Sequence, residues 1–375
     1  MNFSGSNIVL LGLTITSSWG NGHATTYRGL VGALAKRGHN VLFLERDMPW
    51  YASNRDLKEP FAGQVELYDS LDNLKKRYAK VIEKADLVIV GSFVPDGVQV
   101  CEWITGISKG IRAFYDIDTP VTIARLKRGK CDYLTPRLIS EFDLYLSFAG
   151  GPIMDQIKNV FGAPLVRPLY CSVDTENYFP QETMVEYDLG YMGTFSDDRQ
   201  EALEHLMLEP AVKMSDSKFI VAGPLYPESQ IWPHNVRHID HIAPLDHRKF
   251  YCSQKFTLNI TRADMVQSGY APSVRIFEAS ACGVPIISDY WEGLNDLFRS
   301  GEEILVSESS DKTIDFLKNI SDRERLKIGE RARKKVLTSH TAEHRARELE
   351  LYWHEAIKNR AHHSRAGKLY KTMNE

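Results

Sequence analysis

The sequence lacks the features that mark secreted, membrane-spanning and nucleic-acid-binding proteins. Its five cysteines are widely spaced and include no CxxC pair, which argues against a disulfide framework and a cysteine zinc site. No apolar run is long enough for a membrane span, and no cationic segment of signal-peptide type precedes the apolar residues 7–15. The net charge of −3 gives no broadly basic surface. We expect a cytoplasmic protein without a transmembrane segment, whose main partner is not a nucleic acid.

The length and the pattern of apolar residues predict two α/β domains. A chain of 375 residues exceeds the size at which one core stops growing. Short apolar runs alternate with helical patterns from residue 7 to residue 148, and a second such series begins near residue 187. Turn-forming residues separate the two series at 168–180. Because strands that alternate with helices build parallel sheets, we expect two doubly wound, Rossmann-like domains with a cleft between them.

The most informative segment is "GYAPSVRIFEASACGVPIISD", residues 269–289. Ser273 is a plausible N-cap, and the free amides of the helix that follows, near Val274, form an anion site suited to a pyrophosphate. Arg275 places a cation in the first turn, where the helix dipole disfavours it, so an anionic partner would explain it. Glu278, one to two turns further along, could accept hydrogen bonds from the two hydroxyls of a ribose.

Here the sequence resembles a known family. The segment "FEASACGVPIISD" is similar to the nucleotide-sugar motif of GT-B glycosyltransferases, and "YCSVDTENYFP" is similar to the segment that joins their two domains. The stretches "SSWGNGHATTYR", "FYDIDTP", "WPHNV", "TLNITRADM" and "PSVRIFEASACG" together resemble the CgeB-like glycosyltransferases, over residues 7 to about 352. In many retaining GT-B enzymes a second glutamate stands eight positions before the ribose-binding one. Here that position is Tyr270, so the retaining mechanism does not carry over.

The resemblance implies a domain arrangement. An N-terminal acceptor domain covers residues 1–175, and a C-terminal domain that binds the nucleotide-sugar donor covers 176–340. A C-terminal helix at 341–360 returns to the first domain, and 361–375 form a flexible basic tail.

The resemblance also implies donor contacts outside the 273–278 segment. Arg262 matches a basic residue set on the diphosphate, although a surface ion pair would explain it too. Four histidines lie in and beside "HIDHIAPLDHRKFY", but their spacing fits no zinc motif, and we interpret this stretch as the loop that borders the base. The remaining expected contacts, at strand ends and in that loop, are Gly193, Thr194, Gly223, Ile242 and Ala243.

Three residues of the N-terminal half are expected to act on the acceptor. His23 follows the first strand in "GNGH", where inverting GT-B enzymes often carry a general base, and a histidine titrates in the range that such a base needs. Asp116 and Asp118 end a later strand in "FYDID". We expect Asp118 to cap the next helix and Asp116 to face the cleft, where either could orient His23. A turn without a chemical role remains the alternative for His23.

The expected function is therefore transfer of a sugar from a nucleoside diphosphate sugar, such as a UDP or dTDP sugar, to a small-molecule or glycan acceptor. No cofactor and no metal are expected, because helix amides and an arginine can replace a cation. The alternatives are a nucleotide-sugar epimerase on the same architecture and a non-catalytic GT-B scaffold. A dinucleotide-dependent dehydrogenase is disfavoured, because "GNGHATTYRG" lacks the GxGxxG spacing.

Overall fold

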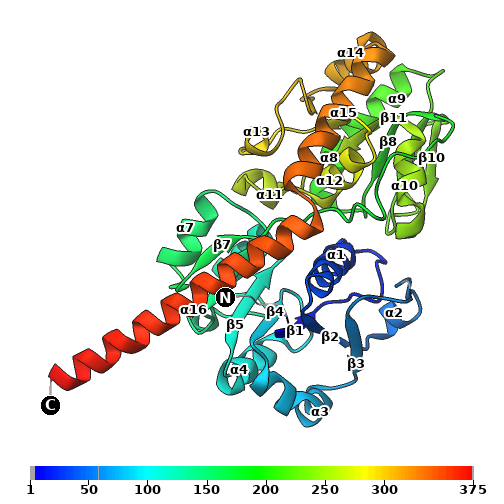
Figure 1. Ribbon diagram of the computed structural model, residues 1–375. Coiled ribbons are helices and arrows are strands. Elements are labelled where there is room, and N and C mark those ends of the chain that lie inside the picture. The colour runs from blue at the N-terminus through cyan, green and yellow to red at the C-terminus, as the bar shows by residue number, and fades with distance from the viewer. Residues whose placement is uncertain (1–4, 58, 374–375) are drawn as a thin grey trace. The chain divides into compact units, whose positions relative to one another are not determined.

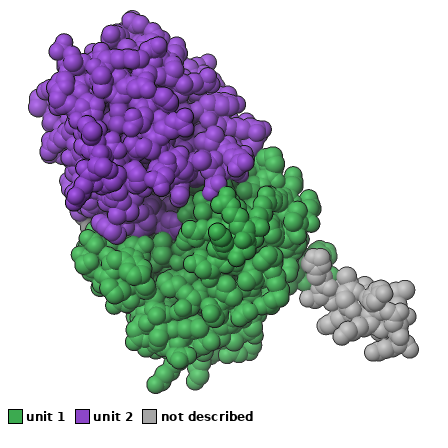
Figure 2. Space-filling model, turned by 180° about the vertical axis from the view of Figure 1, so that it is seen from behind, with its two compact units in different colours: residues 1–17, 27–170, 343–375 green, residues 18–26, 171–342 purple. Residues whose placement is uncertain are grey.

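The chain folds into two compact units. The computed structural model describes residues 5–57 and 59–373, with side chains described up to residue 362. Unit 1 comprises residues 1–17, 27–170 and 343–375, and unit 2 comprises residues 18–26 and 171–342 (Figure 2). The short segment Ser18–Thr26, which contains the "GNGH" loop, is thus grouped with unit 2 although it lies between two parts of unit 1 in the sequence.

The described residues of unit 1 form a seven-stranded sheet of parallel strands in the order β3-β2-β1-β4-β5-β6-β7 (Figure 1). The strands are β1 (Asn7–Gly12), β2 (Asn40–Arg46), β3 (Gln64–Tyr68), β4 (Leu87–Gly91), β5 (Ile111–Asp116), β6 (Leu144–Ser147) and β7 (Val166–Pro168). The helices between them are α1 (His23–Lys36), α2 (Pro49–Ala52), α3 (Leu71–Lys84), α4 (Gly97–Ile107), α5 (Thr119–Lys127), α6 (Pro136–Ile139) and α7 (Pro152–Asn159). The strand order reverses between β1 and β4, so the loops after these two strands flank a switch point of the kind where ligands bind.

Glycine lets α1 lie directly against this switch point. The ring of Tyr27, on α1, is fully buried over β1 and β4. A Cβ atom on Gly12 would come within 2.8 Å of that ring, and one on Gly91 would lie 1.9 Å from the tyrosine oxygen. Larger residues at these two strand ends would therefore push α1 off the sheet.

The last helix, α16 (Ala342–Met373), packs on unit 1. Arg37 binds Glu350 through two contacts of 2.6 Å, and the indole of Trp353 is buried. Further along the helix, Arg360 donates to the carbonyl oxygen of Gly110, the residue before β5, at 2.6 Å. Residues 361–373 continue the same helix, while 374 and 375, the end of the expected tail, lie outside the described residues.

Within the described residues, unit 2 forms a six-stranded parallel sheet in the order β10-β9-β8-β11-β12-β13 (Figure 1). Its strands are β8 (Tyr187–Met192), β9 (Phe219–Ala222), β10 (Val236–Ile239), β11 (Gln254–Asn259), β12 (Ile286–Ser288) and β13 (Leu305–Val306). Its helices are α8 (Asp197–Leu203), a π-helical turn (Glu204–Leu208), α9 (Glu209–Lys213), α10 (Pro244–Cys252), α11 (Ala263–Ser268), α12 (Val274–Ala281), α13 (Leu294–Leu297), α14 (Ser310–Asn319) and α15 (Asp322–Ser339). The expectation of a parallel α/β sheet in each half is confirmed.

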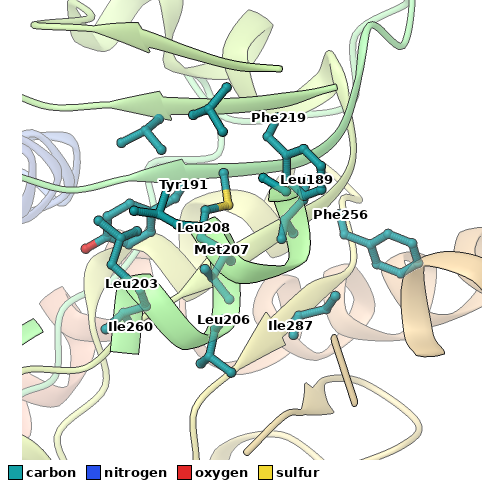
Figure 3. Close-up of a cluster of buried hydrophobic side chains, with 14 of the residues drawn as sticks. Leu189, Tyr191, Leu203, Leu206, Met207, Leu208, Phe219, Phe256, Ile260 and Ile287 are labelled. Carbon is teal, nitrogen blue, oxygen red and sulfur yellow. The ribbon is translucent and has the colours of Figure 1, made fainter. Parts of the chain in front are cut away.

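A tight apolar core fixes the sheet of unit 2. Leucines of the π-helical turn and of α8 pack against the buried faces of β8, β9 and β11 (Figure 3). Figure 3 shows Met207 directed at the strands, close to Leu189, and Leu203 beside the ring of Tyr191. This packing holds the carboxyl ends of the central strands at fixed positions, and those ends carry most of the candidate functional residues.

Candidate active site

The first turn of α12 lies open at the carboxyl edge of the unit 2 sheet. Ser273 takes the N-cap position, as expected, but its side chain makes no capping hydrogen bond. It donates instead to Oδ1 of Asn259 at 2.7 Å. In the part of the chain that the structure describes, the backbone amides of Val274 and Arg275 have no acceptor. The positive end of this helix therefore presents two free N–H groups.

Arg275 is buried beside this turn and points along the strand ends. Its Nε donates to the carbonyl oxygen of Met192 at 2.5 Å, and its Nη1 donates to Asn259 Oδ1 at 2.7 Å. The guanidinium also lies over the ring of Tyr191, 4.9 Å from its centroid. A Cβ atom on Gly193 would stand 3.1 Å from Nη2, so this edge of the guanidinium lies against the backbone of the β8 loop.

Two strand-end loops come close together in front of Arg275. The amide of Gly193 donates to the carbonyl oxygen of Ala222 at 2.8 Å. Gly223 has a φ of +155°, and a Cβ atom there would lie 2.0 Å from the oxygen of Gly193 and 3.1 Å from the nitrogen of Thr194. Gly223 is required by this close approach of backbone to backbone, whereas a side chain at Gly193 would collide with the hydroxyl of Tyr191, which would lie 2.4 Å from its Cβ atom. The structure thus brings together three expected phosphate-side residues, Gly193, Thr194 and Gly223.

Glu278 lies on the same helix in a buried polar cluster. The hydroxyl of Tyr251 donates to its Oε2 at 2.9 Å, and the hydroxyl of Tyr178 also bonds the carboxylate. His247 approaches the same oxygen at 3.8 Å and contacts the Tyr178 hydroxyl at 3.0 Å. Burial raises the pKa of Glu278 to about 7, although both tyrosines favour the ionised form. The carboxyl group is therefore poised to change its charge near neutrality.

The expected base-side loop, with Ile242 and Ala243, leads into α10. The carbonyl oxygen of Ile242 lies 3.1 Å from Nε2 of His247, and Ala243 takes the N-cap position of α10. His238 stacks on Trp232 with ring centroids 4.7 Å apart, and its Nε2 lies 3.1 Å from the carbonyl oxygen of Gly223. Among the described residues, no three side chains of His, Cys, Asp or Glu come together as metal ligands.

Arg262 makes an ion pair rather than standing alone. Its Nε lies 3.5 Å from Oδ2 of Asp198, and its side chain is 42% exposed. The same carboxylate oxygen accepts a hydrogen bond of 3.1 Å from the amide of Ala263, at the start of α11. Of the two candidate arginines, Arg275 is the one that the fold holds rigidly beside the open turn of α12.

The "GNGH" loop lies beside α12. Oδ1 of Asn21 accepts hydrogen bonds from the amides of His23 and Ala24, at 3.1 and 3.3 Å, which fixes the start of α1. A Cβ atom on Gly22 would lie 3.5 Å from the side chain of Val274, the first residue of α12. The loop that carries the buried His23 therefore adjoins the open helix end.

The two aspartates at the end of β5 differ from the expectation. Asp118 takes the N-cap position of α5, but its side chain makes no capping hydrogen bond. Asp116 is fully buried, and its oxygens accept hydrogen bonds of 2.6 Å from both Thr122 and Tyr145. Burial raises the pKa of Asp116 to about 6. The expected capping bond of Asp118 is therefore wrong, and the carboxylate tied into helix α5 is that of Asp116.

Sequence reasoning missed four residues that shape this site. Asn259, Tyr178, Tyr251 and His247 hold Ser273, Arg275 or Glu278 through side-chain contacts. Each is separated from its partner by at least 14 positions, so no local motif links them. The available signal was weak: a polar residue at the end of an apolar strand, as Asn259 is in "TLNIT", faces the ligand edge of the sheet.

Residues 199–350 match the family model described as glycosyl transferase-like. No curated protein matches the sequence. Within the described residues, no helix has both the length and the apolar character that crossing a membrane requires.

Several solved structures share the fold over almost the entire chain. A sucrose-phosphate synthase from Thermosynechococcus elongatus has 13% identity and a TM-score of 0.69, with 94% of this chain and 99% of that chain covered. Anabaena HepE, solved in complex with UDP and glucose, has 11% identity and a TM-score of 0.69, with coverage of 92% and 98%. An alpha-glucosyltransferase, solved with UDP-glucose and DNA, has 14% identity and a TM-score of 0.70, with coverage of 93% and 99%. The chain therefore has the GT-B fold of glycosyltransferases, with two Rossmann-like units.

Proposed function

We propose that this protein is a glycosyltransferase that moves a sugar, of the hexose class, from a nucleoside diphosphate sugar to an acceptor hydroxyl. The observation that carries the proposal is the edge of unit 2, where the open first turn of α12, the fixed guanidinium of Arg275 and the carboxyl group of Glu278 lie on one helix. Free helix amides and a guanidinium suit a diphosphate, and a carboxylate suits the two hydroxyls of a ribose. The glycosyl transferase-like match covers this helix.

In the proposed reaction the acceptor oxygen attacks the anomeric carbon of the sugar while the bond from that carbon to the diphosphate oxygen breaks. His23 takes the proton of the attacking hydroxyl. The electron pair of the broken bond stays on the nucleoside diphosphate, where the amides of Val274 and Arg275 and the guanidinium offset the added negative charge. This arrangement supports a mechanism without a metal ion, and Asp118 is a second residue proposed for the acceptor side.

The sequence stretches that resemble the CgeB-like glycosyltransferases favour that family for this chain. UDP is the first nucleotide to test, because HepE and the alpha-glucosyltransferase were solved with UDP or UDP-glucose. Tyr270 stands where a retaining enzyme would carry its second glutamate. Its backbone has a φ of +51°, and its amide donates to the carbonyl oxygen of Glu292 at 2.6 Å.

A panel of donors tests the proposal directly. We expect UDP or UDP-glucose to raise the melting temperature by several degrees, because a ligand at a hundred times its Kd stabilises the folded state by about 2.7 kcal/mol. The measurement is a thermal shift with UDP, GDP, dTDP and UDP-glucose, each compared with free glucose. If none of the nucleotides stabilises the protein, donor binding by this chain is refuted.

The raised pKa of Glu278 predicts a pH dependence of donor affinity. Ribose hydroxyls donate to the ionised carboxylate, so binding must release a proton wherever the free protein holds Glu278 protonated. Because burial raises this pKa from 4.5 to about 7, we expect affinity to be constant above pH 7 and to fall by up to about tenfold per pH unit below it. UDP-glucose is the suitable probe, because its diphosphate is esterified at both ends and so has no terminal phosphate group whose charge changes in this pH range. Calorimetry on Glu278→Gln should give a flat profile, and a wild-type profile that is also flat would contradict the prediction.

A further inference from the structure

Asn259 ends β11 at a point where several hydrogen bonds converge. It is fully buried. Its Oδ1 accepts from Ser273 Oγ and from Arg275 Nη1, both at 2.7 Å. Its Nδ2 donates to Ser288 Oγ at 2.9 Å and to Thr261 Oγ1 at 3.3 Å. Both acceptor sites and both donor sites of the amide are thus used, which fixes its orientation.

The two bonds to Oδ1 act on both parts of the open helix end. The hydroxyl of Ser273 donates its hydrogen bond to Asn259, and the Ser273 side chain makes no capping bond to the first turn of α12. The amides of Val274 and Arg275 therefore keep their hydrogen-bonding capacity for a ligand. The same oxygen fixes one end of the Arg275 guanidinium, and Met192 fixes its Nε. The edge that carries Nη2 is left beside Gly193.

The two bonds from Nδ2 connect the amide to a rigid support. Ser288 ends the neighbouring strand β12, and Thr261 follows β11. Asp289 accepts from the amide and from the hydroxyl of Thr261, both at 2.8 Å, and Ser288 Oγ lies 3.3 Å from the same carboxylate. The loops after two adjacent strands are therefore joined behind Asn259, and the amide cannot move without breaking several buried bonds.

We propose that Asn259 is a positioning residue that holds the free amides of α12 and the guanidinium of Arg275 ready for the diphosphate of the donor. This inference rests on the proposed function. The neutral amide suits the task, because it accepts from a cation without neutralising it. An aspartate would fit the same space, but its charge would pair with Arg275 and repel an anion. Asn259 itself lies behind Ser273 and Arg275, so it acts through them.

The test compares two variants at position 259 with a matched control. Asn259→Ala removes the acceptor of Ser273 and Arg275, and Asn259→Asp keeps the shape but adds a charge. The control is Asn235→Ala, because Asn235 also belongs to unit 2 and donates to three carbonyl oxygens. Asn235 directly precedes β10 and so lies at the amino end of a strand, whereas Asn259 lies at the carboxyl end of one. UDP binding is measured by calorimetry, uridine binding by competition with UDP, and folding by circular dichroism and melting temperature.

We expect both variants at position 259 to lower UDP affinity about 10- to 100-fold, as for the loss of hydrogen bonds to a charged group, and Asn259→Asp to be the weaker binder. Uridine affinity should change less than about twofold, and Asn235→Ala should lower the melting temperature without changing the ratio of UDP to uridine affinity. Equal losses for UDP and uridine, or a changed ratio in Asn235→Ala, would overturn the positioning role. If the wild-type protein binds no UDP, GDP or dTDP, the proposed function fails first and this inference fails with it.

Discussion

Replacement of Glu278 by alanine should lower the affinity for UDP about 100-fold or more. A carboxylate that accepts two ribose hydroxyls makes two charge-assisted hydrogen bonds, each contributing about 1.5–3 kcal/mol. Alanine removes both and leaves the hydroxyls of Tyr178 and Tyr251 directed at an empty space. Calorimetric titration of UDP into the wild type and the variant measures the loss.

A second buried glutamate of unit 2 serves as the control. Glu303 is 6% exposed and accepts from the amide and guanidinium of Arg299, at 2.8 and 3.0 Å. Glu303→Ala should therefore lower the melting temperature, because the amide and guanidinium of Arg299 lose this acceptor, but it should leave the Kd for UDP unchanged. If Glu278→Ala binds UDP as the wild type does, Glu278 has no part in donor binding and a scaffold without nucleotide binding becomes the better description.

The variant His23→Ala should retain UDP binding and lose sugar transfer. Removal of a general base lowers kcat about 100- to 10,000-fold, whereas the donor contacts that we propose lie on α12 and are intact. The rate is measured as UDP release with UDP-glucose and the best acceptor from a glycan and small-molecule panel, and the Kd for UDP is measured by calorimetry.

His39 provides the matched histidine control. Its ring is buried in unit 1, and its Nε2 lies 3.0 Å from Glu350 on α16. His39→Gln should cost stability and leave kcat within about twofold of the wild type. A wild-type rate in His23→Ala would show that the "GNGH" loop is a turn without a chemical role, and an equal loss of UDP binding would assign His23 to the donor instead.

The sequence predicted the fold well because its signals are local. Apolar runs and helical spacing identified parallel α/β units, and the break at residues 168–180 lies where unit 2 resumes at Cys171. The sequence pattern of residues 198–213 is that of one continuous helix, but in the structure the π-helical turn Glu204–Leu208 interrupts it. A π-helical turn contains one more residue than an α-helical turn, and whether it forms depends on how Leu206 and Met207 pack in the core. The spacing of apolar residues in the sequence does not reveal this packing.

The site was harder to predict, because its hydrogen bonds join distant segments. Ser273 was correctly expected at the N-cap, but its hydroxyl goes to Asn259, a partner on another strand. Asp116 and Asp118 are two positions apart, so in an extended segment their side chains lie on the same face. This spacing does not reveal which of the two carboxylates will bind the helix that follows. The second hydrogen bond to the buried carboxylate of Asp116 comes from Tyr145, on the neighbouring strand.

The path of the chain has a consequence for synthesis on the ribosome. Unit 1 takes its sheet from residues 1–170 but its covering helix from residues after 342. During translation the surface that receives Trp353 and the salt bridges of Glu350 must wait, exposed, until all the strands of unit 2 have been made. A ribosome that stalls between the two units would therefore release a polypeptide with a complete set of unit 1 strands and an uncovered apolar face, a substrate for chaperones rather than a folded domain.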